Sequence, residues 1–157
     1  IDALAANLKR QLDALDFAPE RLLVSFHGMP VRTLKLGDPY HCHCQKTARL
    51  LQEAMGRAVD VAFQSKFGRA KWLEPATDAR LHAYGKEGVR RVAVAAPGFS
   101  ADCIETLEEL GIRGRRTFLA SGGEQFALLD CLNDSSEGIA MLQRLVTREL
   151  AGWVEQE

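Results

Sequence analysis

Short, mainly apolar runs that alternate with segments of helical period are the feature that most constrains how this chain can fold. Residues 21–26, 59–63 and 91–95 are such runs, and residues 117–120 form a weaker one. Runs that lack regular polar alternation are typical of strands buried on both faces of a parallel sheet. Strands that alternate with helices predict an α/β domain, in which helices flank a four-stranded parallel sheet.

The segments between and around these runs carry apolar residues at helical spacing. Helices are expected at residues 4–15, 47–55, 77–85 or 77–88, and 100–110, and a final helix has an apolar face of Ile139, Leu142, Leu145, Val146 and Leu150. Asp134 and Glu137 have the spacing of a capping box ahead of that final helix.

The length of 157 residues is about that of one domain. Its 20 basic and 21 acidic residues give a net charge of −1, which argues against nucleic acid as a partner. No apolar run approaches the roughly 20 residues of a membrane-spanning helix.

The four cysteines are too few for a disulfide scaffold, and the first residues do not resemble a signal peptide, so we expect free thiols and a cytoplasmic location. Because the first residue is not Met, we expect a piece of a longer protein.

The loops that follow the predicted strands hold the candidate site, because ligands of open parallel sheets bind at the carboxyl ends of the strands. These loops are residues 27–30, 64–68, 97–100 and 121–124. His27 lies directly at a strand end, where an imidazole can act as a base or as a metal ligand at neutral pH. A histidine that only fills the loop is an equal alternative.

Glu105 and Glu109 are four residues apart and share one face of a predicted helix, with Glu108 beside them. Since that helix follows the third strand, Glu105 can meet His27 in one cleft. A solvated acidic face is the alternative interpretation. Asp102, in the first turn, is explained by the helix dipole alone.

Two histidines alternate with two cysteines at His41, Cys42, His43 and Cys44, which is the composition of a metal site. The segment falls where a helix begins, and residues two apart on a helix point about 200° away from each other. A metal site is therefore not favoured here. His82, within a predicted helix, is expected to be a solvated surface residue.

A basic loop contains Lys66, Arg69 and Lys71 together with Phe67 and Trp72. This set suits a flat, anionic molecule, and a surface loop that is basic by chance is the alternative. The glycine-containing turns of the chain match neither of the common phosphate-binding motifs, so phosphate binding is not supported.

Five motifs, taken together and in order, resemble the carboxy-terminal half of the ferrochelatase family from about residue 21 to about residue 150. The most specific is Pro97-Gly98-Phe99-Ser100-Ala101-Asp102-Cys103-Ile104-Glu105-Thr106-Leu107-Glu108-Glu109. The others are Phe26-His27-Gly28-Met29-Pro30, Gly37-Asp38-Pro39-Tyr40 with Cys44-Gln45-Lys46-Thr47, Phe63-Gln64-Ser65-Lys66-Phe67-Gly68 with Trp72-Leu73, and Gly122-Gly123-Glu124 with Cys131-Leu132-Asn133-Asp134.

The resemblance implies the insertion of ferrous iron into protoporphyrin IX, which forms protohaem in the terminal step of haem synthesis. It also implies two similar Rossmann-like halves that hold the porphyrin between them. Residues 1–20 are then the connector helix, and residues 21–157 are a Rossmann-like, chelatase-type domain with a four-stranded parallel sheet flanked by helices. The amino-terminal half is expected to be the missing partner.

The resemblance further implies roles for single residues. His27 and Glu105 fall on the essential histidine and glutamate of the family, so they are the predicted catalytic residues and metal ligands. Glu109 is also predicted to bind metal, on an acidic route for metal or protons that leads away from the site. The predicted porphyrin contacts are Ser65, Lys66, Phe67 and Trp72, with Lys66 or Arg69 toward the propionates.

Iron is expected as substrate, and no permanently bound cofactor is expected. Some family members hold an iron–sulfur cluster on cysteines in a tail after the last helix, but residues 152–157 contain no cysteine, so no cluster is predicted. A peripheral membrane contact is left open because the product is apolar. The chain alone is expected to be a poor catalyst, because one wall of the cleft is missing.

Two alternatives stay open. One is a one-domain chelatase for another tetrapyrrole, which could work as a homodimer. The other is a non-catalytic porphyrin-binding module. The stretches at residues 64–66 and 102–109 resemble ferrochelatases better than one-domain chelatases, and the presence of both His27 and Glu105 argues against a module that only binds.

Overall fold

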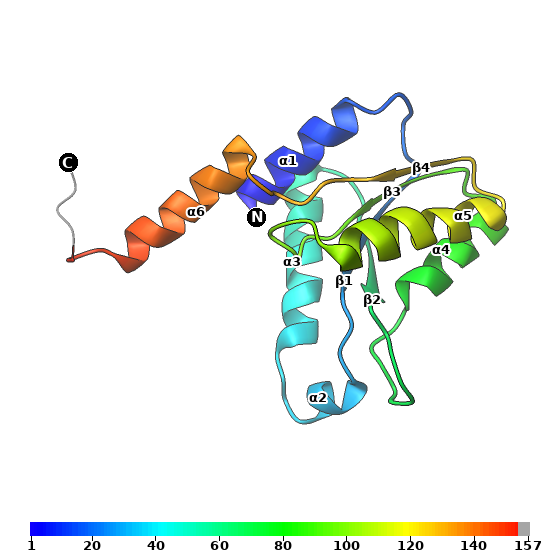
Figure 1. The fold of residues 1–157 in the computed structure, drawn as a ribbon, viewed down its shortest axis with the longest axis horizontal. Helices are drawn as coiled ribbons and strands as arrows, with labels where there is room; N and C mark the ends of the chain where they lie inside the picture. Colours follow the sequence, from blue (N-terminus) through cyan, green and yellow to red (C-terminus); the bar gives the residue numbers. More distant parts are fainter. Residues whose placement is uncertain (154–157) are drawn as a thin grey trace.

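A four-stranded parallel sheet lies at the centre of the computed structural model, which describes residues 1–153 (Figure 1). Every pair of neighbouring strands is parallel, and the order is β2-β1-β3-β4. The strands are β1 (Arg21–His27), β2 (Asp60–Gln64), β3 (Arg91–Ala95) and β4 (Gln125–Leu128). The predicted fold class and the first three predicted strands are therefore confirmed.

Helices flank the sheet on both faces (Figure 1). They are α1 (Asp2–Asp13), α2 (Val31–Lys35), α3 (Tyr40–Met55), α4 (Thr77–Lys86), the π-helix η1 (Glu105–Gly114), α5 (Arg115–Ala120) and α6 (Ser136–Glu149). Because successive residues of a strand point to opposite faces, β1 contributes to two cores. Leu22 and Phe26 pack in one core with α1 and α3, whereas Leu23 packs in the other with α4, η1 and α5.

The fourth strand is not where the sequence analysis placed it. Residues 117–120 belong to α5, and β4 follows that helix. A four-residue apolar run fits a buried strand and a buried helix equally well, and here Phe118 fills the core from the helix, 6.3 Å from the ring of Phe126 in β4. Residues 121–124 therefore precede the strand, and the loop at its carboxyl end is 129–135.

The other helices differ from their predicted bounds mainly at their ends. Helix α3 begins earlier than predicted, at Tyr40, and ends at Met55, where Gly56 with a positive φ of 63° closes the helix. Helix α6 is capped by Ser135, whose hydroxyl accepts a hydrogen bond from the Gly138 N–H (3.1 Å). The capping box predicted at Asp134 is therefore wrong by one residue, and the short helix α2 was not predicted.

Helix η1 is a π-helix, whereas an α-helix was predicted at residues 100–110. Hydrogen bonds of a π-helix join residues five apart, and such segments are rare and are frequently found at functional sites. Apolar spacing alone does not distinguish the two kinds of helix. Because η1 begins only at Glu105, residues 96–104 form a longer loop after β3 than was expected from the sequence.

The apolar face of α6 is largely open to solvent in the part of the chain that the structure describes. The helix extends away from the sheet and contacts α1 near its first turn, where Arg10 pairs with Glu137 (3.2 Å) (Figure 1). Its exposed apolar residues are Ile139, Leu142, Leu145, Val146 and Leu150. The predicted amphipathic pattern is present, and this face can contact another surface.

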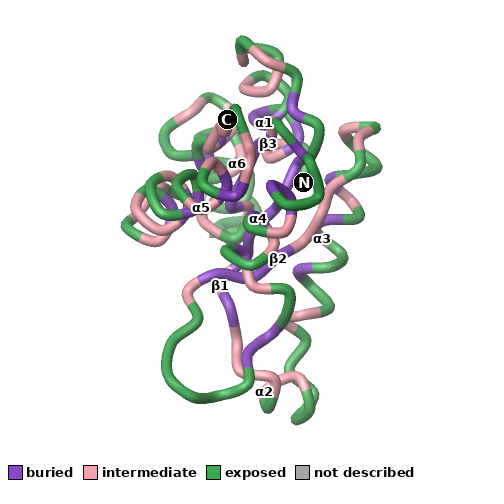
Figure 2. Tube along the Cα trace, turned by 90° about the vertical axis from the view of Figure 1, so that its right-hand side faces the viewer, coloured by how far each residue is buried: buried purple, intermediate pink, exposed green. Residues whose placement is uncertain are grey.

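The end of the molecule that carries α2 is also mostly exposed (Figure 2). Residues 35–39 and residues 66–71 of the loop after β2 are exposed there. The Val31 N–H donates to the backbone oxygen of Lys71 (2.7 Å), so the two segments lie side by side. Within residues 1–153, no helix combines the length and the apolar character needed to cross a membrane.

Candidate active site

Loops at the carboxyl ends of three strands are joined by Gln64, the last residue of β2, of which only 2% is exposed. Its Oε1 accepts a hydrogen bond from the Ser25 hydroxyl (2.9 Å), and its Nε2 donates to the backbone oxygen of Glu105 (2.7 Å). Its backbone oxygen accepts from the N–H of Gly28 (2.7 Å). The loops after β1 and β2 and the start of η1 are therefore held at fixed relative positions.

His27 is the last residue of β1 and is half-buried. Its Nδ1 lies 2.8 Å from the backbone oxygen of Gly28, and because a carbonyl oxygen only accepts, the neutral ring carries its hydrogen on Nδ1. The lone pair is then on Nε2, the atom that can take a proton or bind a metal. The Tyr40 hydroxyl donates to the backbone oxygen of His27 (2.8 Å) and anchors the strand end.

A glycine is required at position 28 because the chain passes very close to β2. A Cβ at Gly28 would lie 2.6 Å from the backbone oxygen of Gln64 and 3.2 Å from the ring of Trp72. Any side chain would push these loops apart. The turn after His27 therefore needs glycine because the backbone lies so close to β2, and not because position 28 has a positive φ.

Glu105 is the first residue of η1. The Cys103 thiol donates to its Oε2 (3.1 Å), and this hydrogen bond lowers the pKa of the Glu105 carboxyl, helped by the backbone N–H of Glu105 and, when the His27 ring is protonated, by its positive charge. The carboxylate is therefore ionised at neutral pH. The structure places His27 and Glu105 at the same edge of the sheet, and among the described residues no hydrogen bond or ion pair joins their side chains.

Asp102 fixes the loop that leads into η1. Its carboxylate accepts from the Thr106 hydroxyl (2.8 Å), from the side-chain amide of Asn133 (2.7 Å) and from the Cys131 N–H (3.2 Å). Burial alone would raise the pKa of Asp102, but these hydrogen bonds outweigh burial and lower it. Asp102 lies before η1, so the hydrogen bonds, and not the helix dipole proposed from the sequence, explain this residue.

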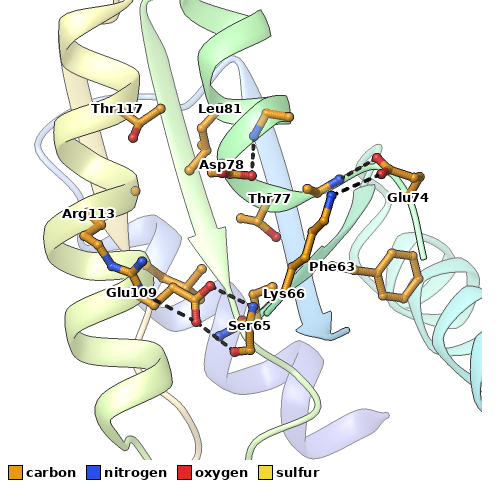
Figure 3. A pocket seen from close by; sticks show the side chains of 15 residues that line it. Phe63, Ser65, Lys66, Glu74, Thr77, Asp78, Leu81, Glu109, Arg113 and Thr117 are labelled. Carbon is orange, nitrogen blue, oxygen red and sulfur yellow. Dashed lines mark hydrogen bonds and ion pairs between the residues drawn. The ribbon is translucent and has the colours of Figure 1, made fainter. Parts of the chain in front are cut away.

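Glu109 lies on η1 beside a cavity of about 340 Å³ between η1 and α4 (Figure 3). Its carboxylate accepts two hydrogen bonds from Ser65, one from the backbone N–H and one from the hydroxyl, both 2.7 Å. Arg113 places Nη2 3.9 Å from Glu109 and Nε 2.9 Å from Glu108. A cation therefore offsets the acidic helix face that the sequence predicted.

The basic loop after β2 presents Phe67 and not Trp72 to solvent. Phe67 is 75% exposed, whereas Trp72 is only 6% exposed and lies against Gly28 with its ring 5.4 Å from that of Phe67. Among the described residues, the buried Nε1 of Trp72 has no hydrogen-bond partner. Lys66 is exposed, 4.0 Å from Glu74. Phe67 and Lys66 can therefore contact a flat ligand directly, whereas the buried Trp72 packs against Phe67 and supports it.

The alternating histidines and cysteines of α3 point in different directions. Cys44 is buried in the core, Cys42 and His43 are exposed, and His41 lies 5.8 Å from the ring of Phe63. The four side chains do not converge on one point. His82 is exposed on α4, as predicted.

No role was predicted from the sequence for Gln64, Cys103 or Asn133. A polar residue at the end of a mainly apolar strand was a usable signal for Gln64, because a buried amide needs hydrogen-bond partners. The contact of Asn133 with Asp102 joins two loops that are distant in sequence, and no local spacing predicts it.

Comparisons of the sequence with known proteins agree on one family. The model of the family described as Ferrochelatase matches residues 1–150. Ferrochelatases from Agrobacterium fabrum and Rhizobium meliloti are each 52% identical in an alignment that covers 98% of this chain and 46% of theirs. The ferrochelatase from Methylocella silvestris is 50% identical, and the alignment covers 98% of this chain and 45% of that protein. The chain thus spans about half the length of these curated relatives.

A solved structure shares the fold. It is described as a CbiX protein of cobalamin biosynthesis from Marinobacter aquaeolei, and it superposes with a TM-score of 0.58 at 16% sequence identity. The match covers 83% of this chain and 97% of that one. At this identity the likeness concerns the fold alone.

We expect Asp102→Asn to lower the free energy of unfolding at pH 7 by roughly 1 kcal/mol, because charge-assisted hydrogen bonds to the loops are weakened. Folding lowers the pKa of Asp102, so its contribution is present above the unfolded pKa of roughly 3.9 and is lost as the pH falls through the folded value. Urea unfolding at several pH values should show a difference in the free energy of unfolding between Asp102→Asn and the wild type, and this difference should become smaller below about pH 4.

The matched control is Asp130→Asn, because the Asp130 carboxylate accepts no hydrogen bond from other described residues. The free energy of unfolding of this variant should stay close to that of the wild type at every pH. A difference for Asp102→Asn that stays constant down to acidic pH would mean that the Asp102 network does not stabilise the fold through its charge.

Proposed function

This chain belongs to the ferrochelatase family, and on that basis we propose that it forms one half of an enzyme that inserts ferrous iron into protoporphyrin IX to give protohaem. The observation that carries the proposal is that Gln64 joins the loop after His27 to the start of η1 at Glu105, at one edge of the sheet. His27 and Glu105 each supply an acceptor there, the Nε2 of a neutral imidazole and the oxygens of an ionised carboxylate. The other features of the site hold these two groups in place.

The reaction needs both kinds of acceptor. Metal insertion replaces the two N–H protons of the free porphyrin by one Fe²⁺ ion, so two protons must leave for each ion that enters. A neutral imidazole and a carboxylate can each accept a proton or hold the metal transiently. His27 and Glu105 are therefore proposed as the catalytic residues and as the transient ligands of the iron, which is a substrate and not a resident cofactor.

The loop after β2 is proposed to bind the porphyrin. The exposed ring of Phe67 can pack on the macrocycle, supported by Trp72, and Lys66 or Arg69 can pair with its propionates. Ser65 joins this loop to the site. Contacts at the edges of the macrocycle can supply binding energy to bend it, which exposes the pyrrole nitrogens to metal.

The opposite wall of the cleft is proposed to come from the amino-terminal half of a longer polypeptide, since the relatives are about twice as long as this chain. The connector role of residues 1–20, the absence of an iron–sulfur cluster, the cytoplasmic location and a peripheral membrane contact stay predictions. The role of Glu109 on a route for metal or protons also stays a prediction.

In the longer polypeptide, we expect His27→Ala to lower the rate of zinc insertion into a soluble porphyrin at least about a hundredfold, the usual loss when a proton acceptor is removed. Porphyrin affinity should change little, because the ring is held mainly by the loop after β2. Insertion is followed by the absorbance of the metallated product, and binding by quenching of porphyrin fluorescence. His82→Ala, an exposed change on α4, serves as control. If His27→Ala inserted zinc at the wild-type rate, His27 would not be a catalytic residue.

A second candidate function is that of a one-domain chelatase that works without another half. The observation that favours it is that this fold forms nearly the whole chain of the CbiX structure, 97% of which is covered.

We expect residues 1–157 alone to insert zinc at least about tenfold more slowly than the longer polypeptide at equal concentration, because binding energy from the second wall is missing. Equal rates would favour the one-domain enzyme.

A further inference from the structure

We propose that Glu109 is a positioning residue, which holds Ser65 in a left-handed backbone conformation and thereby orients the porphyrin-binding loop at residues 66–71. That the loop binds a porphyrin rests on the proposed function, whereas the contact between Glu109 and Ser65 does not depend on it. This role differs from the route for metal or protons that the family resemblance implies for Glu109.

The contact between the two residues is specific in geometry. One carboxylate oxygen of Glu109 accepts from the backbone N–H of Ser65 and the other accepts from its hydroxyl, both at 2.7 Å (Figure 3). Two hydrogen bonds from different atoms of one residue fix its position and orientation. Hydrogen bonds to an ionised acceptor are also stronger than those between neutral groups.

Ser65 needs this support because of its backbone conformation. Its φ is +62°, and among the described residues that are not glycine only Ser65 and Asn133 have a positive φ. For a serine this conformation is uncommon and unfavourable without compensating contacts. Ser65 follows the fixed Gln64 directly, so its backbone angles set the direction in which the exposed loop leaves the sheet.

The loop itself has few other restraints. At its far end the backbone oxygen of Lys71 accepts from the Val31 N–H (2.7 Å). Between the two ends, the described contacts are the packing of Phe67 on Trp72 and the 4.0 Å approach of Lys66 to Glu74. Ser65 is therefore one of two anchors of the loop, and Glu109 holds it.

Glu109 is itself held in place, and its carboxylate is occupied. The side chain is 21% exposed, and Arg113, one turn further along η1, approaches it at 3.9 Å. Each oxygen of the carboxylate already accepts one hydrogen bond from Ser65, so a metal ion bound there would share the carboxylate with Ser65. By contrast, the only neighbouring side chain in the described residues that donates to the Glu105 carboxylate is that of Cys103.

Limited trypsin digestion of this chain tests the contact without any assumption about activity, because Lys66, Arg69 and Lys71 are cleavage sites within the loop. In Glu109→Ala, cleavage within residues 66–71 should become at least about fivefold faster, since susceptibility follows the population of open states. Ser65→Ala, which loses one of the two bonds, should be intermediate. Glu108→Ala is the control, because Glu108 pairs with Arg113 but does not contact Ser65.

Glu109→Gln separates positioning from metal binding. A glutamine oxygen can accept from the Ser65 N–H while its amide donates to the Ser65 hydroxyl, so both contacts can survive without the charge. Cleavage of this variant should stay close to that of the wild type. Unchanged cleavage in both Glu109→Ala and Ser65→Ala would overturn the proposal.

Steady-state zinc insertion by the longer polypeptide gives the second readout. Glu109→Ala should raise the KM for porphyrin about tenfold and leave the KM for zinc unchanged, because it disturbs the loop that binds the ring. Glu109→Gln should restore the porphyrin KM. A rise in the zinc KM in both variants would instead assign Glu109 to metal delivery. If the wild-type polypeptide inserts no metal, the proposed function fails, while the digestion still decides the contact.

Discussion

The buried side chain of Gln64 is the interaction on which the candidate site depends. It accepts from Ser25 inside the sheet and donates to the backbone of Glu105, and its own backbone receives the N–H of Gly28. The imidazole of His27 and the carboxylate of Glu105 come from separate loops, so their relative position rests on this bridge. An apolar side chain in its place would remove the hydrogen bonds to the Ser25 hydroxyl and to the backbone oxygen of Glu105, at a cost of roughly 1 kcal/mol for each bond, and would leave Ser25 only its contact with Thr77 (2.7 Å).

Much of the fold could be predicted from the sequence because three strands are buried on both faces, and such strands leave an unambiguous apolar pattern. The errors fall where the pattern is ambiguous. The apolar run at residues 117–120 is too short to distinguish strand from helix, and its helical form places Phe118 in the core. The hydrogen bonds of η1 join residues five apart, and no spacing of apolar residues encodes that choice.

The sequence placed His27 and Glu105 at the same edge of the sheet, where the carboxyl ends of parallel strands lie, and their action in one cleft stays a prediction. It could not predict which side chains support them. The hydrogen bonds of Asp102 connect loops that are far apart along the chain, and the burial of Trp72 depends on how closely Gly28 approaches it. The open apolar face of α6 fits a chain that spans about half the length of its relatives.

The most direct test of this account is long-range ¹H–¹⁵N NMR of the His27 ring in residues 1–157, at a pH where the ring is neutral. The hydrogen bond to Gly28 predicts that Nδ1 carries the hydrogen and Nε2 the lone pair. Added Zn²⁺ should then shift the Nε2 resonance, and Glu105→Gln should weaken that shift because the second ligand is lost. A ring with its hydrogen on Nε2, or an Nε2 resonance that does not respond to Zn²⁺, would contradict the account.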